Sequence, residues 1–202
     1  MVKVVLSGFE PFDGYSINPS EELVRMLDGK KITTHEIRGI VLPLDYGKAD
    51  KLLKDFVAKE RPRYVICCGQ ANRPIITLEY VGLNILNTER EDNYGYKPTS
   101  HIIDPSAPAA YFSTIDLHSI VRKLKDNGIP SGVSYHAGTY GCNWILFTML
   151  HWLSMSNIQA KVAFVHVPPL PDQSIEKNDA SLATMPLGVQ VDALRIIIES
   201  LH

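Results

Sequence analysis

The sequence predicts an α/β sandwich with a mostly parallel sheet. Short apolar segments with the composition of strands alternate with longer segments that have helical spacing, and this alternation is typical of that fold class. Residues 162–167 (VAFVHV) are the clearest strand, a nearly continuous apolar run. Residues 45–60 are the clearest helix, because Ala49, Leu53 and Val57 share one face.

The elements follow one another in a regular order. Strands are expected at residues 1–7, 37–42, 64–68, 75–86, 131–135 and 162–167. Helices are expected at residues 19–26, 45–60, 114–127 and 142–155, with a last helix from about residue 186. Asn18 is the expected cap of the first helix, with Pro19 at its first position, and Gly128 ends the third. Residues 87–113 are polar and irregular, which indicates a surface loop or a hairpin.

Length and composition indicate an ordinary globular protein. The chain has 202 residues, so we expect a single domain over residues 1–202. Apolar residues make up 45% of it and charged residues 21%, which is enough apolar material for a buried core. The net charge is −2 with both signs interspersed, so no nucleic-acid partner is expected.

The sequence also argues against a membrane protein and against a disulfide-bonded one. No apolar run is long enough to span a bilayer, and the amino terminus lacks a signal-peptide core. The three cysteines, Cys67, Cys68 and Cys142, form no disulfide framework, which fits a cytoplasmic location. Two adjacent cysteines and a distant one also make a poor zinc site, so no metal is expected.

Cys142 is the first candidate for chemistry. It lies in HAGTYGCNWILF, where two glycines precede an apolar helical run, so it falls at or near the first turn of a helix. Free N–H groups and the dipole at that end are expected to lower the thiol pKa and can bind a developing oxyanion. An inert cysteine that fills space in the core is an equally good interpretation of this residue alone.

His166 and Glu79 are the other two candidates. His166 interrupts an apolar strand just before two prolines, and active groups of α/β folds gather at the carboxyl ends of strands, where a histidine can act as base and acid. Glu79 lies in the predicted strand ITLEYVGLN and could orient that imidazole. Taken alone, each residue is explained better by a structural role, a hydrogen-bonded histidine for His166 and an outward-facing strand residue for Glu79. His136 is the one rival base.

Taken together, several ordered motifs resemble the pyroglutamyl peptidase I family (pyrrolidone carboxyl peptidases). They are SGFEPFDG followed by NPS, then VLPL, CGQA, ITLEYVGLN, HAGTYGCN and FVHVPPLPDQ. The resemblance covers nearly the whole chain. It implies a cysteine peptidase that removes N-terminal pyroglutamate (5-oxoproline) from peptides. It also implies a three-layer α/β/α sandwich with a twisted central sheet, no cofactor, and a homo-oligomer, often a tetramer.

The resemblance also assigns roles to residues. It implies Cys142 as the nucleophile, His166 as general base and acid, and Glu79 as the residue that orients His166. In the substrate pocket it implies ring-binding aromatic side chains, a contact to the lactam amide and an aromatic side chain beside the nucleophile. These roles fall on Phe9, Phe12, Gln70 and Tyr140.

Two positions depart from the family pattern. Glu89 stands where an arginine is common, with Arg90 next to it, and Gly141 replaces a larger apolar residue. These changes leave two other functions open. One is an amidase for a different small acyl group, and the other is a noncatalytic binding protein on the same fold.

Overall fold

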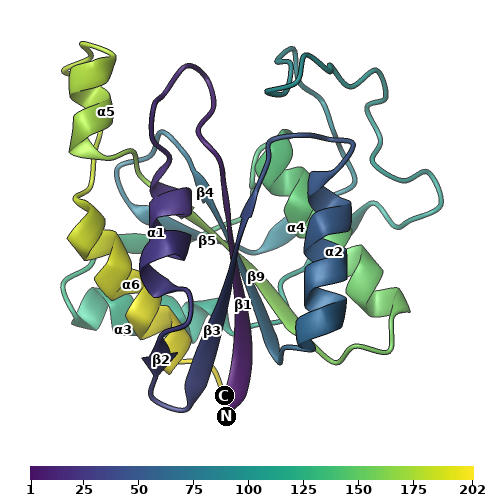
Figure 1. Ribbon diagram of the computed structural model, residues 1–202, viewed down its shortest axis with the longest axis horizontal. Helices are drawn as coiled ribbons and strands as arrows, with labels where there is room; N and C mark the ends of the chain where they lie inside the picture. The colour runs from purple at the N-terminus through teal and green to yellow at the C-terminus, as the bar shows by residue number, and fades with distance from the viewer.

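The elements of the computed structural model, which describes residues 1–202, follow the predicted alternation (Figure 1). The strands are β1 (Val2–Phe9), β2 (Lys31–Ile32), β3 (His35–Leu42), β4 (Tyr64–Gln70), β5 (Ile76–Glu79), β6 (Val81–Leu83), β7 (Ala110–Phe112), β8 (Ser131–Ser134) and β9 (Lys161–Val167). The helices are α1 (Pro19–Leu27), α2 (Ala49–Glu60), α3 (Leu117–Asp126), α4 (Gly141–Met155), α5 (Pro171–Glu176) and α6 (Leu187–Glu199).

Seven strands form the central sheet in the order β2-β3-β1-β4-β9-β5-β8. The pairs β1–β3, β1–β4, β4–β9 and β5–β8 are parallel, whereas β2–β3 and β5–β9 are antiparallel. The sheet is therefore mostly parallel, as the sequence predicts. Helices supply the crossovers that parallel neighbours require.

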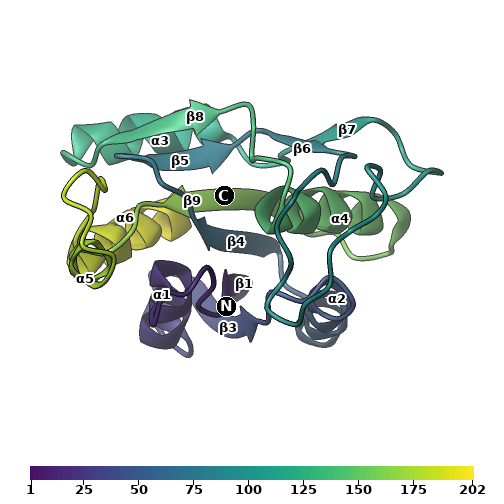
Figure 2. The same cartoon turned by 90° about the horizontal axis from the view of Figure 1, so that it is seen from above.

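Helices cover both faces of this sheet, which gives three layers (Figure 2). Val4 and Leu6 of β1 pack into one apolar cluster together with residues of α1, α3 and α6. Val5, between them, packs into a second cluster with residues of α2 and α4. Because successive strand residues face opposite sides, a strand covered on both faces needs an apolar run without polar interruptions. This explains the continuous apolar strands of the sequence and confirms the α/β/α sandwich.

The chain departs from the prediction after β5. Residues 75–86 form two strands instead of one, because the chain leaves the central sheet at Tyr80 and β6 pairs with β7 in a separate hairpin. A Cβ at Gly82 would lie 3.0 Å from the backbone of Phe147, so this hairpin packs closely on α4. Two short elements, β2 and α5, were not predicted. Each is too short to show a period in sequence.

Capping side chains set the starts of two helices. Asn18 Oδ1 accepts a hydrogen bond from Ser20 N at 2.9 Å, which confirms Asn18 as the cap of α1. Asp116 Oδ1 accepts from Ser119 N at 3.1 Å, so α3 begins at Leu117 instead of residue 114. The aspartate cap, two residues after the expected start, explains this difference.

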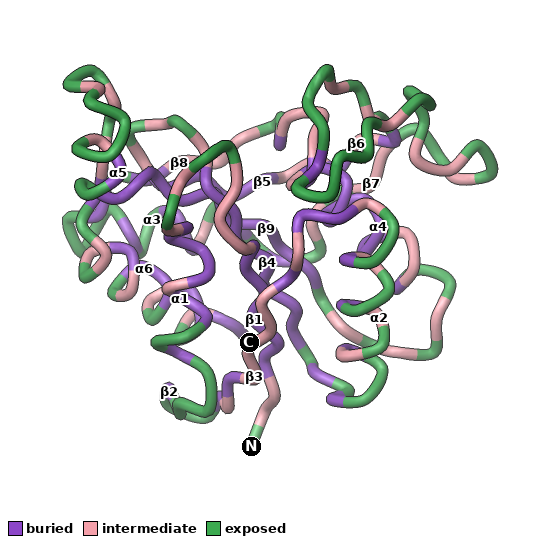
Figure 3. Tube along the Cα trace, turned by 45° about the horizontal axis from the view of Figure 1, so that its top comes forward, coloured by how far each residue is buried: buried purple, intermediate pink, exposed green.

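The carboxyl ends of β1, β4 and β9 meet at one edge of the sheet, and both chain termini lie near the opposite edge (Figure 1). Exposed backbone concentrates in the loops, while the central strands are buried along most of their length (Figure 3). None of the helices has the length and apolar character needed to cross a membrane.

Candidate active site

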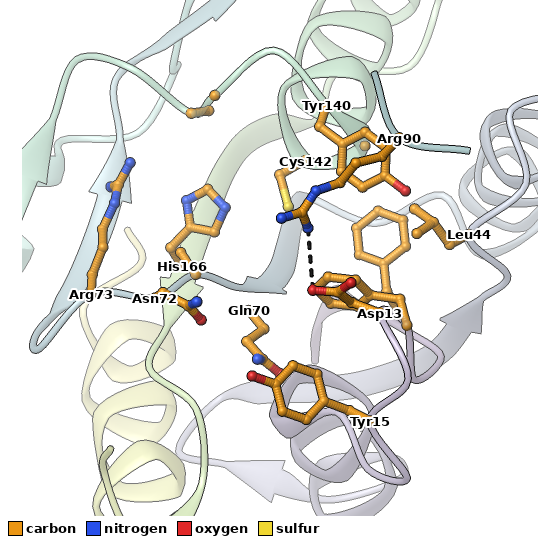
Figure 4. A pocket seen from close by; sticks show the side chains of 16 residues that line it. Asp13, Tyr15, Leu44, Gln70, Asn72, Arg73, Arg90, Tyr140, Cys142 and His166 are labelled. Carbon is orange, nitrogen blue, oxygen red and sulfur yellow. Dashed lines mark hydrogen bonds and ion pairs between the residues drawn. The ribbon is translucent and has the colours of Figure 1, made fainter. Parts of the chain in front are cut away.

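A cavity of about 290 Å³ opens at the carboxyl ends of the central strands. Six of the seven predicted site residues line it, namely Phe9, Phe12, Gln70, Tyr140, Cys142 and His166 (Figure 4). The strand order accounts for this meeting. Since β1, β4 and β9 are adjacent and parallel, Phe9 at the end of β1, Gln70 at the end of β4 and His166 near the end of β9 reach the same edge.

Close packing of the end of β1 on the start of α1 places Phe9 at this cavity. Phe9 N donates to Ser20 Oγ at 2.9 Å, and a Cβ at Gly8 would lie only 2.1 Å from Ser20 O. Only glycine therefore allows β1 to approach the start of α1 this closely. Glu10 secures the loop that follows, because its Oε1 accepts from Leu44 N at 3.0 Å and from Asn93 Nδ2 at 2.8 Å.

Cys142 lies in the first turn of α4, as the sequence predicts. No side chain caps this end of the helix, so N–H groups of the first turn remain available at the cavity. A Cβ at Gly69 would lie 2.7 Å from Cys142 Sγ, so the sulfur sits directly against the β4 backbone. Asn143, fully buried, ties this turn to β6 by donating to Leu83 O and accepting from Leu83 N.

The electrostatics of Cys142 differ from the expectation of a lowered thiol pKa. The pKa of Cys142 is raised to about 12, chiefly by burial and next by the negative charge of Glu79, while the positive charge of Arg73 opposes both. The sulfur keeps partial exposure to the cavity, but burial of its charged form is the largest effect on the pKa, and the backbone hydrogen bond at Cys142 that lowers the pKa is a smaller one. The resting group is therefore a neutral thiol that needs a base before it can attack.

His166 and Glu79 form a buried pair beside this thiol. His166 Nδ1 and Glu79 Oε1 are 2.8 Å apart, and the two residues are 4% and 0% exposed. The antiparallel pairing of β5 with β9 creates the contact, because Glu79 stands opposite Phe164 and is thus a diagonal neighbour of His166 on the same face. With Nδ1 held by the carboxylate, Nε2 is free on the side of Cys142, toward which the imidazole points (Figure 4).

Glu79 is held in its charged form. Burial raises the pKa of its carboxyl group, but the hydrogen bond and charge of His166, together with the charge of Arg73, outweigh burial and lower that pKa. The interpretation of Glu79 as an outward strand residue is therefore wrong.

Arg73 is a site residue that sequence reasoning missed. Its Nη1 donates to Glu79 Oε1 at 2.7 Å and to Thr77 Oγ1 at 2.8 Å, and its Nη2 donates to His136 O at 2.9 Å. One signal was present in the sequence. A glutamate inside an apolar strand needs a cationic partner, and Arg73 is the nearest cation along the chain before it.

Gln173, also missed, holds Gln70 in place. Gln173 is fully buried, and its Nε2 donates to Gln70 Oε1 at 2.9 Å while its Oε1 accepts from Leu170 N at 2.8 Å. The amide oxygen of Gln70 is thus occupied, which leaves its NH₂ group for the cavity. The PDQ part of the last family motif ends at this glutamine.

The structure explains both departures from the family pattern. Arg90 lines the cavity and its Nη1 lies 3.4 Å from Asp13 Oδ2, whereas Glu89 points away and pairs with Lys97. An arginine therefore reaches the pocket rim in spite of the shift by one position. A Cβ at Gly141 would lie 2.8 Å from Leu44 Cδ1, so Leu44 occupies the space that a larger residue would take.

His136, the rival base, lies outside the cavity lining. Its ring Nδ1 accepts from Gly138 N at 3.1 Å, and its backbone oxygen supports Arg73. His136 therefore helps to shape the turn before Cys142.

Comparison with known proteins supports the resemblance seen in the sequence. The sequence profile of the family described as pyroglutamyl peptidase matches residues 2–202. The chain belongs to this family. A pyrrolidone-carboxylate peptidase of Thermococcus kodakarensis is 40% identical, and the alignment covers 99% of this chain and 98% of that protein.

Solved structures of family members have the same fold. The pyrrolidone carboxyl peptidase of Thermococcus litoralis superposes with a TM-score of 0.94 at 36% identity, over 98% of this chain and 92% of that one. Pyroglutamyl peptidase I of Bacillus amyloliquefaciens gives 0.92 at 34% identity, over 96% and 92%. The three-layer sandwich of this chain is therefore the family fold.

The geometry makes a prediction for thiol labelling. Iodoacetamide is expected to modify Cys142 well before Cys67 or Cys68, because Cys142 lines the cavity whereas the other two are completely buried in β4. Since the pKa of Cys142 is raised to about 12, its labelling rate should keep rising with pH across the neutral range. Peptide mapping after short exposures at several pH values measures both features. A rate that is already constant at neutral pH would mean a preformed thiolate.

Proposed function

We propose that this chain is a cysteine peptidase that removes N-terminal pyroglutamate from peptides, with Cys142, His166 and Glu79 as its catalytic residues. One observation carries the proposal. A partly exposed thiol at a helix start shares a cavity with an imidazole whose other nitrogen is held by a buried carboxylate at 2.8 Å. This is the arrangement of nucleophile, base and orienting acid that acyl transfer needs.

The reaction follows from these positions. His166 Nε2 takes the proton of the Cys142 thiol as the sulfur attacks the pyroglutamyl carbonyl carbon, which gives a tetrahedral oxyanion. Free N–H groups at the start of α4 are placed to stabilise that oxyanion. His166 then gives its proton to the departing amine of the peptide, which leaves a pyroglutamyl thioester on Cys142. Water, deprotonated by His166, hydrolyses the thioester and restores the thiol.

The cavity suits a small neutral lactam. Phe9 and Phe12 supply apolar walls for a ring, and the NH₂ group of Gln70 can donate to the lactam carbonyl. Proline has the same ring size but lacks that carbonyl, and its ring nitrogen is charged. A proline residue would leave Gln70 unpaired, so a prolyl substrate should be rejected strongly. Tyr140 flanks Cys142, and its hydroxyl donates to Glu91 O at 3.1 Å, which ties this wall of the pocket to the loop that carries Arg90.

A fluorogenic assay tests the function. Pyroglutamyl-coumarin amide should be hydrolysed, while the prolyl and alanyl analogues should react at least 10⁴-fold more slowly, because a site built for a hydrogen-bonding group rejects analogues that lack it by about that factor. Turnover of another acyl amide in preference would indicate an amidase. Tight binding of pyroglutamyl peptides without turnover would indicate a noncatalytic protein.

The same proposal extends to assembly and location. We infer a homo-oligomer, with a tetramer as the family resemblance implies, and a cytoplasmic location. All three cysteines are free, which suits a reducing compartment. The proposed substrate is a peptide, and the proposal includes no nucleic-acid partner, metal or organic cofactor.

A further inference from the structure

One oxygen of Glu79 carries every hydrogen bond of its carboxylate. Oε1 accepts from His166 Nδ1 at 2.8 Å, from Arg73 Nη1 at 2.7 Å and from Thr77 Oγ1 at 2.9 Å. The buried Oε2 has no partner, and the nearby Ser134 hydroxyl donates to a backbone oxygen instead. The imidazole of His166 and the guanidinium of Arg73 therefore bind the same carboxylate oxygen.

Arg73 is itself fixed by the neighbouring strand. Its Nη1 lies 3.1 Å from Ser134 Oγ at the end of β8, and its Nη2 lies 2.9 Å from His136 O just beyond. A guanidinium is planar and presents its donors in a rigid fork, so these contacts determine where Nη1 meets Glu79. Only 32% of the Arg73 side chain is exposed, and that of Glu79 is fully buried.

We propose that Arg73 is a positioning residue for the peptidase reaction, which holds Glu79 Oε1 against His166 Nδ1 and offsets the charge of the carboxylate. The inference rests on the proposed function, because it assigns His166 as the base. A carboxylate alone would favour the charged imidazolium, which cannot accept a proton. The positive charge of Arg73 nearly cancels the negative charge of the Glu79 carboxylate. The carboxylate can therefore orient the imidazole through a hydrogen bond without strongly favouring imidazolium.

Other titratable groups surround the Cys142–His166 pair. Asp13, Tyr15, Arg90 and Tyr140 line the cavity, His136 lies at the turn before α4 outside that lining, and Cys67 is buried on β4. Asp13 and Arg90 pair with each other at the rim and largely compensate. Arg73 is the only cation among the hydrogen-bond donors to Glu79 apart from His166 itself.

Two substitutions separate charge from geometry. Arg73→Met removes a positive charge, which makes the loss of each proton from the Cys142–His166 pair harder, so both limbs of the pH–rate profile should move to higher pH. We expect a shift of about half a unit to one unit, below the one to three units of a direct contact, because Arg73 is partly exposed and acts through Glu79. Arg73→Lys keeps the charge and loses the fork, so kcat should fall several-fold with an unmoved profile.

A double variant provides the decisive control. Arg73→Met/Glu79→Gln removes both charges, so its profile should return close to the wild-type position, although its kcat stays low. It also serves if Arg73→Met alone does not fold, because it leaves no unpaired carboxylate in the core. A profile that is unmoved in Arg73→Met, or one that moves equally in Arg73→Lys, would overturn the proposal.

Labelling of Cys142 tests the inference without relying on peptidase activity. Iodoacetamide labelling at a fixed pH of about 8 should be roughly three- to tenfold slower in Arg73→Met than in wild type and unchanged in Arg73→Lys. This factor is the expected shift of about half a unit to one unit in proton loss, expressed as the change in the thiolate fraction that reacts. If the wild-type chain hydrolyses no pyroglutamyl substrate, the proposed function fails while this comparison still reports on Arg73. Equal labelling rates in all three proteins would show that Arg73 has only a structural role.

Discussion

Replacing Cys142 with alanine is expected to abolish hydrolysis of pyroglutamyl substrates. The sulfur is the only nucleophile among the proposed catalytic residues, and without it no thioester can form. Removal of the nucleophile of a triad costs about six orders of magnitude in kcat, so the residual rate should lie at or below detection. Cys142→Ser should be almost as inactive, because a hydroxyl is a far weaker nucleophile than a thiol at neutral pH.

Cys67→Ala is the matched control for this loss. Cys67 is completely buried in β4, and burial raises its pKa to about 12, as it does for Cys142. The control variant should keep its activity and lose only stability. Circular dichroism should show the native fold in all three variants. Wild-type turnover by Cys142→Ala would refute the peptidase mechanism.

Glu79→Gln is expected to lower kcat by roughly two to four orders of magnitude, by analogy with other triad acids. The glutamine keeps a hydrogen-bonding group near Nδ1 but loses the charge that stabilises imidazolium once His166 has taken the thiol proton. Since Glu79 does not contact substrate, KM should change far less than kcat. Removing a negative charge also makes proton loss easier, so both limbs of the pH–rate profile should move to lower pH, opposite to the shift expected for Arg73→Met.

Glu60→Gln is the control for loss of a buried carboxylate. Glu60 is 7% exposed and pairs with Lys3 and Arg38, and it lies at the end of α2, outside the cavity lining. This variant should affect stability without moving the pH–rate profile. If Glu79→Gln is folded and shows the wild-type rate and profile, Glu79 has no catalytic role and another residue must orient His166.

The fold could be predicted largely from local patterns. Apolar runs identified β4 and β9, and helical spacing identified α2 and α6, because burial on both faces or on one stripe leaves a direct trace in sequence. The split between β5 and β6 left no such trace. It depends on the strands with which the two segments pair, because β5 joins the central sheet whereas β6 pairs with β7 in the hairpin on α4.

The site was less predictable than the fold. From sequence alone a structural interpretation was equally good for Cys142 and better for His166 and Glu79, and only the ordered family motifs favoured chemistry. The roles of Arg73 and Gln173 were missed, although a charged Glu79 in an apolar strand calls for a cation and Gln173 ends the last family motif. The contacts of Arg73 depend on the pairing of β5 with β8, which brings Ser134 beside Glu79, and those of Gln173 depend on the turn that follows β9; both are set by long-range packing.

The sign of the thiol pKa shift was predicted wrongly for a related reason. The position of Cys142 at a helix start is visible in sequence, and it favours a thiolate. The burial of the sulfur against Gly69 and its proximity to Glu79 are tertiary features, and together they raise the pKa to about 12. A neutral thiol gives His166 the role of base during the attack itself.

A reactive pyroglutamyl analogue tests nucleophile and substrate class in one measurement. The chloromethyl ketone of pyroglutamic acid presents the lactam to the cavity and an alkylating carbon to the sulfur. We predict that peptide mapping will find one equivalent on Cys142, that activity will fall in proportion, and that the prolyl analogue will react far more slowly. Modification of a different residue, or equal reaction with the prolyl analogue, would contradict the proposed site.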